Sequence, residues 1–291
     1  MTAPELSVWT PIMLQQLLDV LALEDLGGDE FAGTIMHPKG FRVYGGQVLA
    51  QALSAAQYTV DPLRTVHSQH AYFLREGKTD RPIHYRVERA RDGGSFSSRR
   101  VVASQDDRPI LVSSLSFQLP DESFDFQEPL PAVCGPEGLP SERALALASG
   151  NLNENFMITT GEDLDVRMVS PIDWEVPAQR EGKLQSWIRT AGALADDPSL
   201  HRSILTYCSD TMLLDAGLIQ HGRTYRDRDL QVASLDHAIW FHADFRADQW
   251  LLHSAELERN SGGRTLVRGR FYTRAGIHVA TVMQQGLMRK R

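Results

Sequence analysis

Two histidines and one serine in the first third of the chain have spacings that can support chemistry. His67 and His70 stand three residues apart, and two imidazoles at that spacing can begin a metal site. No third ligand follows at a recognisable spacing, so a structural or substrate-side role is favoured for both, and we expect no bound metal. Gly94-Ser95 lacks the second glycine of a G-x-S-x-G nucleophile elbow, which excludes a serine-hydrolase site of that kind.

Glycine pairs and cysteines give equally little support for a cofactor. Gly45-Gly46 and Gly262-Gly263 lack the lysine-bearing loop of a phosphate cradle, so nucleotide hydrolysis is not indicated. Cys134 and Cys208 are too few for a disulfide framework or a four-cysteine zinc site. We expect no cofactor.

Composition limits the classes of partner. The 291 residues include 30 Lys plus Arg against 37 Asp plus Glu, and this net charge of -7 argues against a nucleic-acid binder held by bulk charge. The N-terminus does not resemble a signal peptide, and glutamines interrupt the longest uncharged run, residues 44–60, so we expect no membrane span. The C-terminus is not a peroxisomal address of the S-K-L type, and the predicted compartment is the cytoplasm.

Periodicity predicts the elements that must position any site. Apolar residues after Pro11 recur at helical spacing up to Gly27-Gly28, and the run 46–58 has almost no polar face except glutamines, which is typical of a buried helix. Alternation with period two then predicts strands from residue 66 to 118. Residues 120–140 hold five of the 14 prolines and favour a linker. After the linker we expect strands near 166–169 and 184–189, a buried helix over 209–219, and strands from 230 to the end.

The order of elements repeats, and so do several segments. VYGGQVLAQAL (43–53) aligns with TYCSDTMLLDA (206–216), which pairs Tyr44 with Tyr207 and Gln47 with Asp210. VHSQHAYF (66–73) aligns with ASLDHAIW (233–240), pairing His67 with Ser234 and His70 with His237. The two double glycines also correspond, and the last strands of the halves pair Ser116 with Gln284.

The repeat predicts an α+β fold of two tandem units, each a long helix wrapped by an antiparallel sheet, with the two sheets paired side by side. We place the first unit and its N-terminal helix at residues 1–119, a linker at 120–150 and the second unit at 151–291.

Seven segments resemble the acyl-CoA thioesterase II (TesB-type) family, whose members are double-hotdog proteins that hydrolyse acyl-CoA to free acid and coenzyme A. The segments are GGQVLAQAL, VHSQHAYFLREG, RDGGSFSSRRV, SSLSFQ, YCSD, ASLDHAIWFH and TVMQQGLMR, in this order along nearly the whole chain.

The resemblance implies a catalytic set of Asp210, Ser234 and Gln284. The family has an Asp at the start of the second hotdog helix, a Ser or Thr on the next strand and a Gln on the last strand. The adjacent Gln285 leaves the amide ambiguous by one position, although neighbouring strand residues point to opposite faces. Asp210 would be held ionised by backbone N–H groups of a helix N-terminus and would act as a general base on water, without a covalent acyl-enzyme.

Three further residues are expected on the substrate side. His67 would be lent to the site by the first unit, and the backbone at Gly46 and Gln47 is a candidate oxyanion hole, with Asp210 as another. Taken singly, Asp210 is better explained as an N-cap or early-turn residue of a helix, and only its joint match with Ser234 and Gln284 favours a catalytic role.

We therefore expect an acyl-CoA thioesterase, with fatty acyl-CoA as the small-molecule partner. The alternative is a non-catalytic acyl-CoA binding or sensing protein of the same fold, and a hotdog hydratase or dehydratase is disfavoured by the motifs. We also expect a homo-oligomer, dimer or tetramer, because related proteins commonly assemble and an exposed sheet edge would encourage it.

Overall fold

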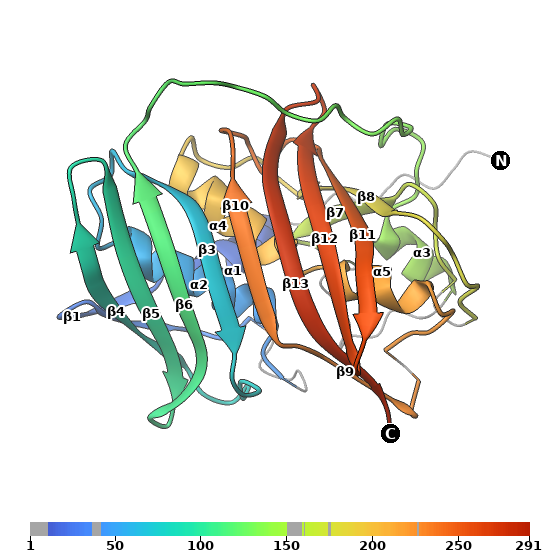
Figure 1. Cartoon of the computed structure of the whole chain (residues 1–291), viewed down its shortest axis with the longest axis horizontal. Coiled ribbons are helices and arrows are strands. Elements are labelled where there is room, and N and C mark those ends of the chain that lie inside the picture. Colours follow the sequence, from blue (N-terminus) through green and yellow to red (C-terminus); the bar gives the residue numbers. More distant parts are fainter. Residues whose placement is uncertain (1–10, 37–41, 150–158, 160, 174–175, 226) are drawn as a thin grey trace.

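One continuous antiparallel sheet dominates the computed structural model (Figure 1), which describes all residues except 1–10, 37–41, 150–158, 160, 174–175 and 226. Helices α1 (Pro11–Leu21), α2 (Gly45–Gln57), α3 (Glu142–Ser149), α4 (Pro198–Ser209) and α5 (Leu213–Ile219) lie behind it in that view. The strands are β1 (Glu24–Gly27), β2 (Glu30–Gly33), β3 (Thr65–Phe73), β4 (Ile83–Asp92), β5 (Phe96–Gln105), β6 (Arg108–Gln118), β7 (Leu164–Met168), β8 (Leu184–Thr190), β9 (Leu230–Ser234), β10 (Asp236–Phe241), β11 (Leu251–Ser261), β12 (Arg264–Thr273) and β13 (His278–Lys290).

The order of the 13 strands in the described sheet separates the chain into two halves. It runs β1-β2-β4-β5-β6-β3-β10-β13-β12-β11-β8-β7, with β9 pairing to β13. Strands β3 and β10 meet at the centre, where Ala71 stands opposite His237. The predicted α+β architecture with two paired sheets is confirmed.

Each half packs its sheet around a buried helix. In α2 every residue from Gly46 to Ala56 is buried, as its nearly unbroken apolar and small composition predicts. Helix α4 is buried from His201 to Ser209 and packs against α2, where Ser203 Oγ contacts Ser54 Oγ at 3.2 Å. The two helices and the two halves of the sheet therefore share one core.

The pairing of the strands shows the internal repeat more clearly than the sequence does. An extra residue bulges β4 at Ala90 and β11 at Glu258, 168 residues apart. A second bulge falls on β6 at Ile110 and on β13 at Val279, 169 residues apart. Because bulges are specific local features, their recurrence at offsets that differ by a single residue indicates a duplicated unit.

These registers correct the sequence alignment of the halves by one residue on the strands. The rung His70–Ser114 in the first half matches Ala238–Met283 in the second. His67 is itself the bulged residue of β3, which side-chain periodicity does not reveal. His67, His70 and Ser116 are therefore not the counterparts that we predicted. The corrected pairs are Val66 with Ser234, Gln69 with His237, and Leu115 with Gln284.

Two predicted helix boundaries were wrong. The helix expected over 209–219 is α4 followed by α5, because Met212 adopts a left-handed conformation (φ 59°) that interrupts the helix. Helix α4 begins earlier, where the Asp197 carboxylate accepts a hydrogen bond from Ser199 N and Pro198 follows it. Helix α1 ends at Leu21, whereas Gly27 is the last residue of β1 and Gly28 lies in the turn to β2.

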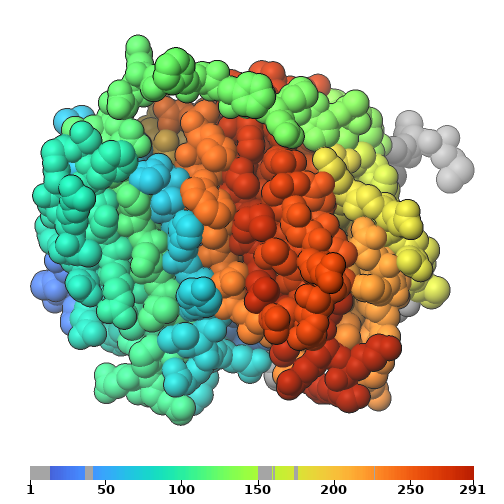
Figure 2. Space-filling view, in the orientation of Figure 1, coloured from blue at the N-terminus to red at the C-terminus, as the bar shows by residue number. Residues whose placement is uncertain are grey.

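The proline-rich segment has no regular secondary structure, as its composition predicts. Residues 119–141, all described, contain no helix or strand and pass over the upper ends of β10, β13 and β12 on the way from β6 toward α3 (Figures 1 and 2). Gln127 Nε2 donates to Gly276 O at 2.7 Å, and Trp187 Nε1 donates to Cys134 O at 2.8 Å. The linker is thus fastened to the second half. The expected domain boundary at 150–151 lies outside the described residues.

Candidate active site

Asp210 sits where the second central helix breaks. It is the residue after α4, with φ -81° and ψ -9°, and its carboxylate is partly buried. Oδ2 accepts the backbone N–H of Gly46 at 3.0 Å, and Oδ1 accepts Gln284 Nε2 at 2.8 Å. A helix N-terminus does donate a backbone N–H to this carboxylate, as predicted. The helix is not the one that carries Asp210, however, but α2 of the first half.

Two glycines allow that approach. A Cβ at Gly45 would lie 2.7 Å from Asp210 Oδ2, and one at Gly46 would lie 2.4 Å from the carbonyl oxygen of Tyr207. Both distances are shorter than real Cβ contacts. The backbone of α2 can therefore reach the second half only because both residues lack a side chain.

Gln284 and Ser234 complete a hydrogen-bonded cluster with Asp210. Gln284 is buried on β13, and its Nε2 donates to Ser234 Oγ at 2.7 Å as well as to Asp210. Ser234 is the last residue of β9, so strand pairing with β13 brings the two together. Gln284, and not Gln285, faces this cluster, which resolves the ambiguity between the two amides.

Burial sets the protonation of the carboxylate. Desolvation raises the pKa of Asp210 to about 6, while the bonds from Gln284 and Gly46 and the charge of Arg42 act in the opposite direction. The carboxylate is therefore mostly ionised at neutral pH but far more basic than an exposed aspartate. A group with this pKa is suited to take a proton from water.

Tyr44, which the sequence did not mark as a site residue, fixes the chain on both sides of Asp210. Its hydroxyl donates to Tyr207 O at 2.9 Å and lies 2.9 Å from Thr211 Oγ1. Its ring meets that of Tyr207 edge-on, with centroids 5.1 Å apart. The alignment of the two halves had paired these tyrosines as equivalents. That pairing was the only feature of the sequence that set Tyr44 apart.

Two of the predicted substrate-side groups are engaged elsewhere. Gln47 is buried, where its Oε1 accepts Met36 N at 3.2 Å and its Nε2 donates to Thr34 O at 2.9 Å. Its backbone N–H donates to Tyr44 O at 3.2 Å, and the Gly46 N–H is given to Asp210. Neither backbone N–H of the predicted oxyanion hole is therefore left without a partner.

The structure does not bring His67 to the cluster. It lies near the start of β3 beside Phe96, with ring centroids 5.8 Å apart. The other end of β3 is the end near the site, where Phe73 N donates to Leu235 O next to Ser234. Burial lowers the pKa of His67.

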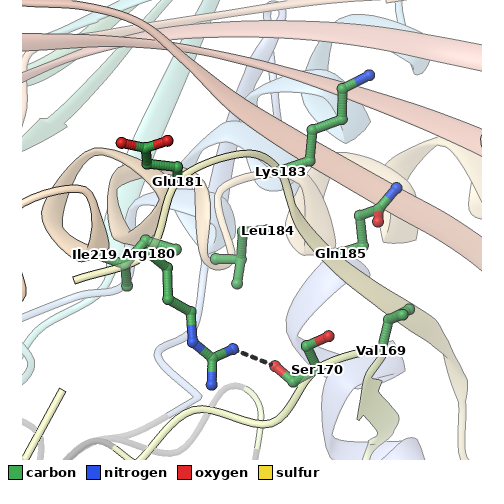
Figure 3. Close-up of a pocket in the computed structure, with 8 residues that line it drawn as sticks. All are labelled: Val169, Ser170, Arg180, Glu181, Lys183, Leu184, Gln185 and Ile219. Carbon is green, nitrogen blue, oxygen red and sulfur yellow. Dashed lines mark hydrogen bonds between the residues drawn. The ribbon is translucent and has the colours of Figure 1, made fainter. Parts of the chain in front are cut away.

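A separate surface pocket borders α5 and contains none of the predicted site residues (Figure 3). It encloses about 440 Å³ and is lined by Val169, Ser170, Arg180, Glu181, Lys183, Leu184, Gln185 and Ile219. Arg180 Nη1 donates to Ser170 O at 3.0 Å, and its Nη2 donates to Pro171 O at 2.5 Å. Much of the guanidinium's donor capacity is thus used by the chain itself.

In the part of the chain that the structure describes, no cluster of side chains is suited to metal or thiol chemistry. No group of three or more His, Cys, Asp or Glu residues there could hold a metal ion. Cys134 is exposed and Cys208 is buried, and both are free thiols.

The comparisons with known proteins agree on one family. A family model described as acyl-CoA thioesterase matches residues 169–287, and one described as acyl-CoA thioesterase N-terminal domain matches residues 35–118.

Individual relatives match over nearly the whole chain. Acyl-CoA thioesterase 2 of Haemophilus influenzae is 34% identical, over 95% of this chain and 98% of the relative. Human acyl-coenzyme A thioesterase 8 is 34% identical, over 93% of this chain and 88% of the relative. The crystal structure of an acyl-CoA thioesterase II, TesB2, from Mycobacterium marinum covers 96% of this chain and 98% of that chain, with a TM-score of 0.78 and 37% identity. The fold is thus the expected double hotdog.

Proposed function

We infer that this chain, which belongs to the acyl-CoA thioesterase family, hydrolyses fatty acyl-CoA to a free fatty acid and coenzyme A. The comparisons give no support to the alternative of a non-catalytic acyl-CoA binding protein. What remains to be assigned is which residues act, and we propose that they are Asp210, Ser234 and Gln284.

The observation that carries this assignment is the bonding of the Asp210 carboxylate. Each oxygen accepts one hydrogen bond from the protein, from Gly46 N and from Gln284 Nε2, and each keeps further acceptor capacity. Asp210 uses it to bind a water molecule and to remove its proton. The raised pKa of about 6 supports this role, since the base is ionised yet strong at neutral pH.

Ser234 and Gln284 hold the water in line with the thioester carbonyl. Ser234 Oγ accepts from Gln284 Nε2, so its own hydroxyl proton is left for a bond toward the reactants. Water oxygen bonds to the carbonyl carbon as its proton moves to Asp210. The C–S bond then breaks, and Asp210 returns the proton to the leaving sulfur, so that acid and thiol form without a covalent acyl-enzyme.

Release of free coenzyme A thiol from acyl-CoAs of C2 to C18 tests the reaction and the base together. Asp210→Asn is expected to lower turnover at least about 100-fold, the order of a lost general base. Asp215→Asn is the matched comparison, because burial also raises the pKa of Asp215, to about 7, yet in the described structure no hydrogen bond joins it to Gln284 or Ser234. If Asp215→Asn lost turnover and Asp210→Asn did not, the general base would be Asp215. Binding without turnover by the wild type would reinstate the non-catalytic alternative.

We further propose the domain division at 1–119, 120–150 and 151–291, a cytoplasmic location and a homo-oligomeric assembly, dimer or tetramer. The matches of two family models to residues 35–118 and 169–287 support the division. In the described part of the chain no helix has the length and apolar character needed to cross a membrane. Light scattering of the purified protein tests the oligomer directly.

A further inference from the structure

A buried histidine connects the Gln284 amide to the end of α4. His237 Nδ1 lies 2.9 Å from Gln284 Oε1, and its Nε2 lies 2.9 Å from Ser209 Oγ. His237 is on β10 and fully buried, and Ser209 directly precedes Asp210. Neither residue is among the site residues predicted from the sequence.

The hydrogen bonds of Gln284 fix the position of the proton between its amide and His237. Both N–H groups of Gln284 are donated, to Asp210 and to Ser234, so Oε1 can only accept. His237 must therefore donate through Nδ1–H. Burial lowers the pKa of His237 to about 4, so the ring is neutral and its Nε2 carries no proton when Nδ1 does. The Ser209 hydroxyl has one proton and two acceptors within reach, His237 Nε2 at 2.9 Å and Thr206 O at 2.8 Å, so Nε2 has a donor only when Ser209 turns away from Thr206. This tautomer is the one that holds the amide with its nitrogen toward Asp210.

The orientation of the amide matters most when Asp210 carries a proton. An ionised carboxylate attracts the amide nitrogen without help. Once Asp210 has taken the proton of water, its O–H can instead donate to Gln284 Oε1, so a turned amide becomes equally well bonded. A turned amide would present no N–H to Ser234. Only the bond from His237 Nδ1–H disfavours that state.

The first half contains a comparison without this function. Gln69 occupies the position of His237, and Leu115 that of Gln284. Gln69 Nε2 donates to Leu49 O of α2 at 3.1 Å and to Ser113 Oγ at 3.3 Å. A buried polar residue at this position thus ties strand to helix in both halves, but only in the second half does the tie reach a side-chain amide beside a carboxylate.

Resting on the proposed function of Gln284, we propose that His237 is a positioning residue that, through its Nδ1–H, keeps the Gln284 amide turned toward Asp210 through the whole reaction. The titratable groups that act on Asp210 or His237 from neighbouring elements are Arg42, Tyr44, Asp215, Tyr225 and His253. In the described structure Arg42, Tyr44, Asp215 and His253 make no hydrogen bond to the Gln284 amide.

Kinetics of three variants test the proposal. His237→Leu removes the donor and is expected to lower kcat about 10- to 100-fold with KM changed less than threefold, since a misplaced group costs rate and not binding. Free rotation of the amide also stabilises protonated Asp210, so the acid limb of kcat should move to higher pH by about half a unit or more. His237→Asn restores a donor at a similar place and should recover most of kcat and the wild-type limb. Ser209→Ala, which removes the hydroxyl 2.9 Å from His237 Nε2, should give an intermediate loss.

His253→Asn is the control for replacing a buried neutral histidine. His253 is buried on β11 and stacks on Phe271 with centroids 4.3 Å apart, and burial likewise lowers its pKa, to about 3. Its variant should keep kcat and the pH profile. Circular dichroism establishes that each variant is folded, and if His237→Leu is not, His237→Asn and Ser209→Ala still decide the question.

The outcomes separate this inference from the proposed function. If Gln284→Ala keeps full turnover, the proposed site itself fails. If Gln284→Ala is impaired but His237→Leu retains wild-type kcat, or if His237→Asn and His237→Leu lose kcat equally with an unmoved acid limb, His237 is only a structural tie. In support, the double variant His237→Leu/Gln284→Ala should be no slower than Gln284→Ala alone.

Discussion

Replacing Asp210 by asparagine should make the protein less active and more stable at once. The pKa of this carboxyl is raised from 3.8 to about 6, so the folded protein holds its proton more tightly than the unfolded chain does. Stability is therefore lost as the pH rises from about 4 to above 6, where the buried carboxylate must ionise. A shift of roughly 2 pKa units corresponds to about 3 kcal/mol at pH 8, and solvent access to this partly buried group reduces the expected gain to about 1–3 kcal/mol.

Urea denaturation of wild type and Asp210→Asn at pH 8 and pH 5 measures this gain. At pH 5 the wild-type carboxyl is mostly protonated when folded, so the advantage of asparagine should fall to about half. Asp165→Asn is the opposite control, because Asp165 is buried but paired with Arg167 at 2.9 Å and Arg189 at 3.5 Å. That variant should lose stability at both pH values, since it leaves two arginines without their partner. An Asp210→Asn protein no more stable than wild type at pH 8 would refute the argument from desolvation.

Three further outcomes are expected. The acid limb of kcat/KM should titrate with an apparent pKa of about 6, seen in thiol release between pH 4.5 and 8.5; a limb near 4 would contradict a desolvated Asp210. Ser234→Ala should lower kcat about tenfold or more with little change in KM, whereas Ser234→Thr keeps the hydroxyl and should retain most of the rate; equal losses would remove the hydroxyl from the mechanism. Gly46→Ala places a Cβ 2.4 Å from Tyr207 O, so both kcat and the denaturation midpoint should drop, while Gly94→Ala, with open space around it, should change neither.

The sequence predicted well what depends on local pattern. Helix 46–58 was expected from its apolar run and is α2, and the linker was expected from its prolines. The match of Asp210, Ser234 and Gln284 to the family pattern predicted three side chains that the structure joins by hydrogen bonds. Their catalytic role is a proposal that the variants above test.

What the sequence missed depends on bulges, breaks and contacts between halves. The bulge at His67 shifts the strand register by one residue, and no periodicity of side chains announces it. The break at Met212 requires a left-handed residue that is not glycine, so the helix was predicted to run through it. The donation from Gly46 to Asp210 spans 164 positions, and nothing local to either residue indicates it.

Because Gly46 of the first repeat donates a hydrogen bond to Asp210 of the second, the two repeats should differ in which substitutions they tolerate. In two identical units, each helix start would face the carboxylate of the other, but here Gln47 stands in the aligned place of Asp210, and Val66 and Leu115 replace Ser234 and Gln284. The first repeat therefore lacks the three side chains of the proposed site, but the N-terminus of its helix α2 still donates a hydrogen bond to Asp210 in the second repeat. Under the proposed mechanism, substitutions on its strands should be tolerated as ordinary core changes, whereas Gly45 and Gly46 should be as intolerant of replacement as the catalytic residues themselves.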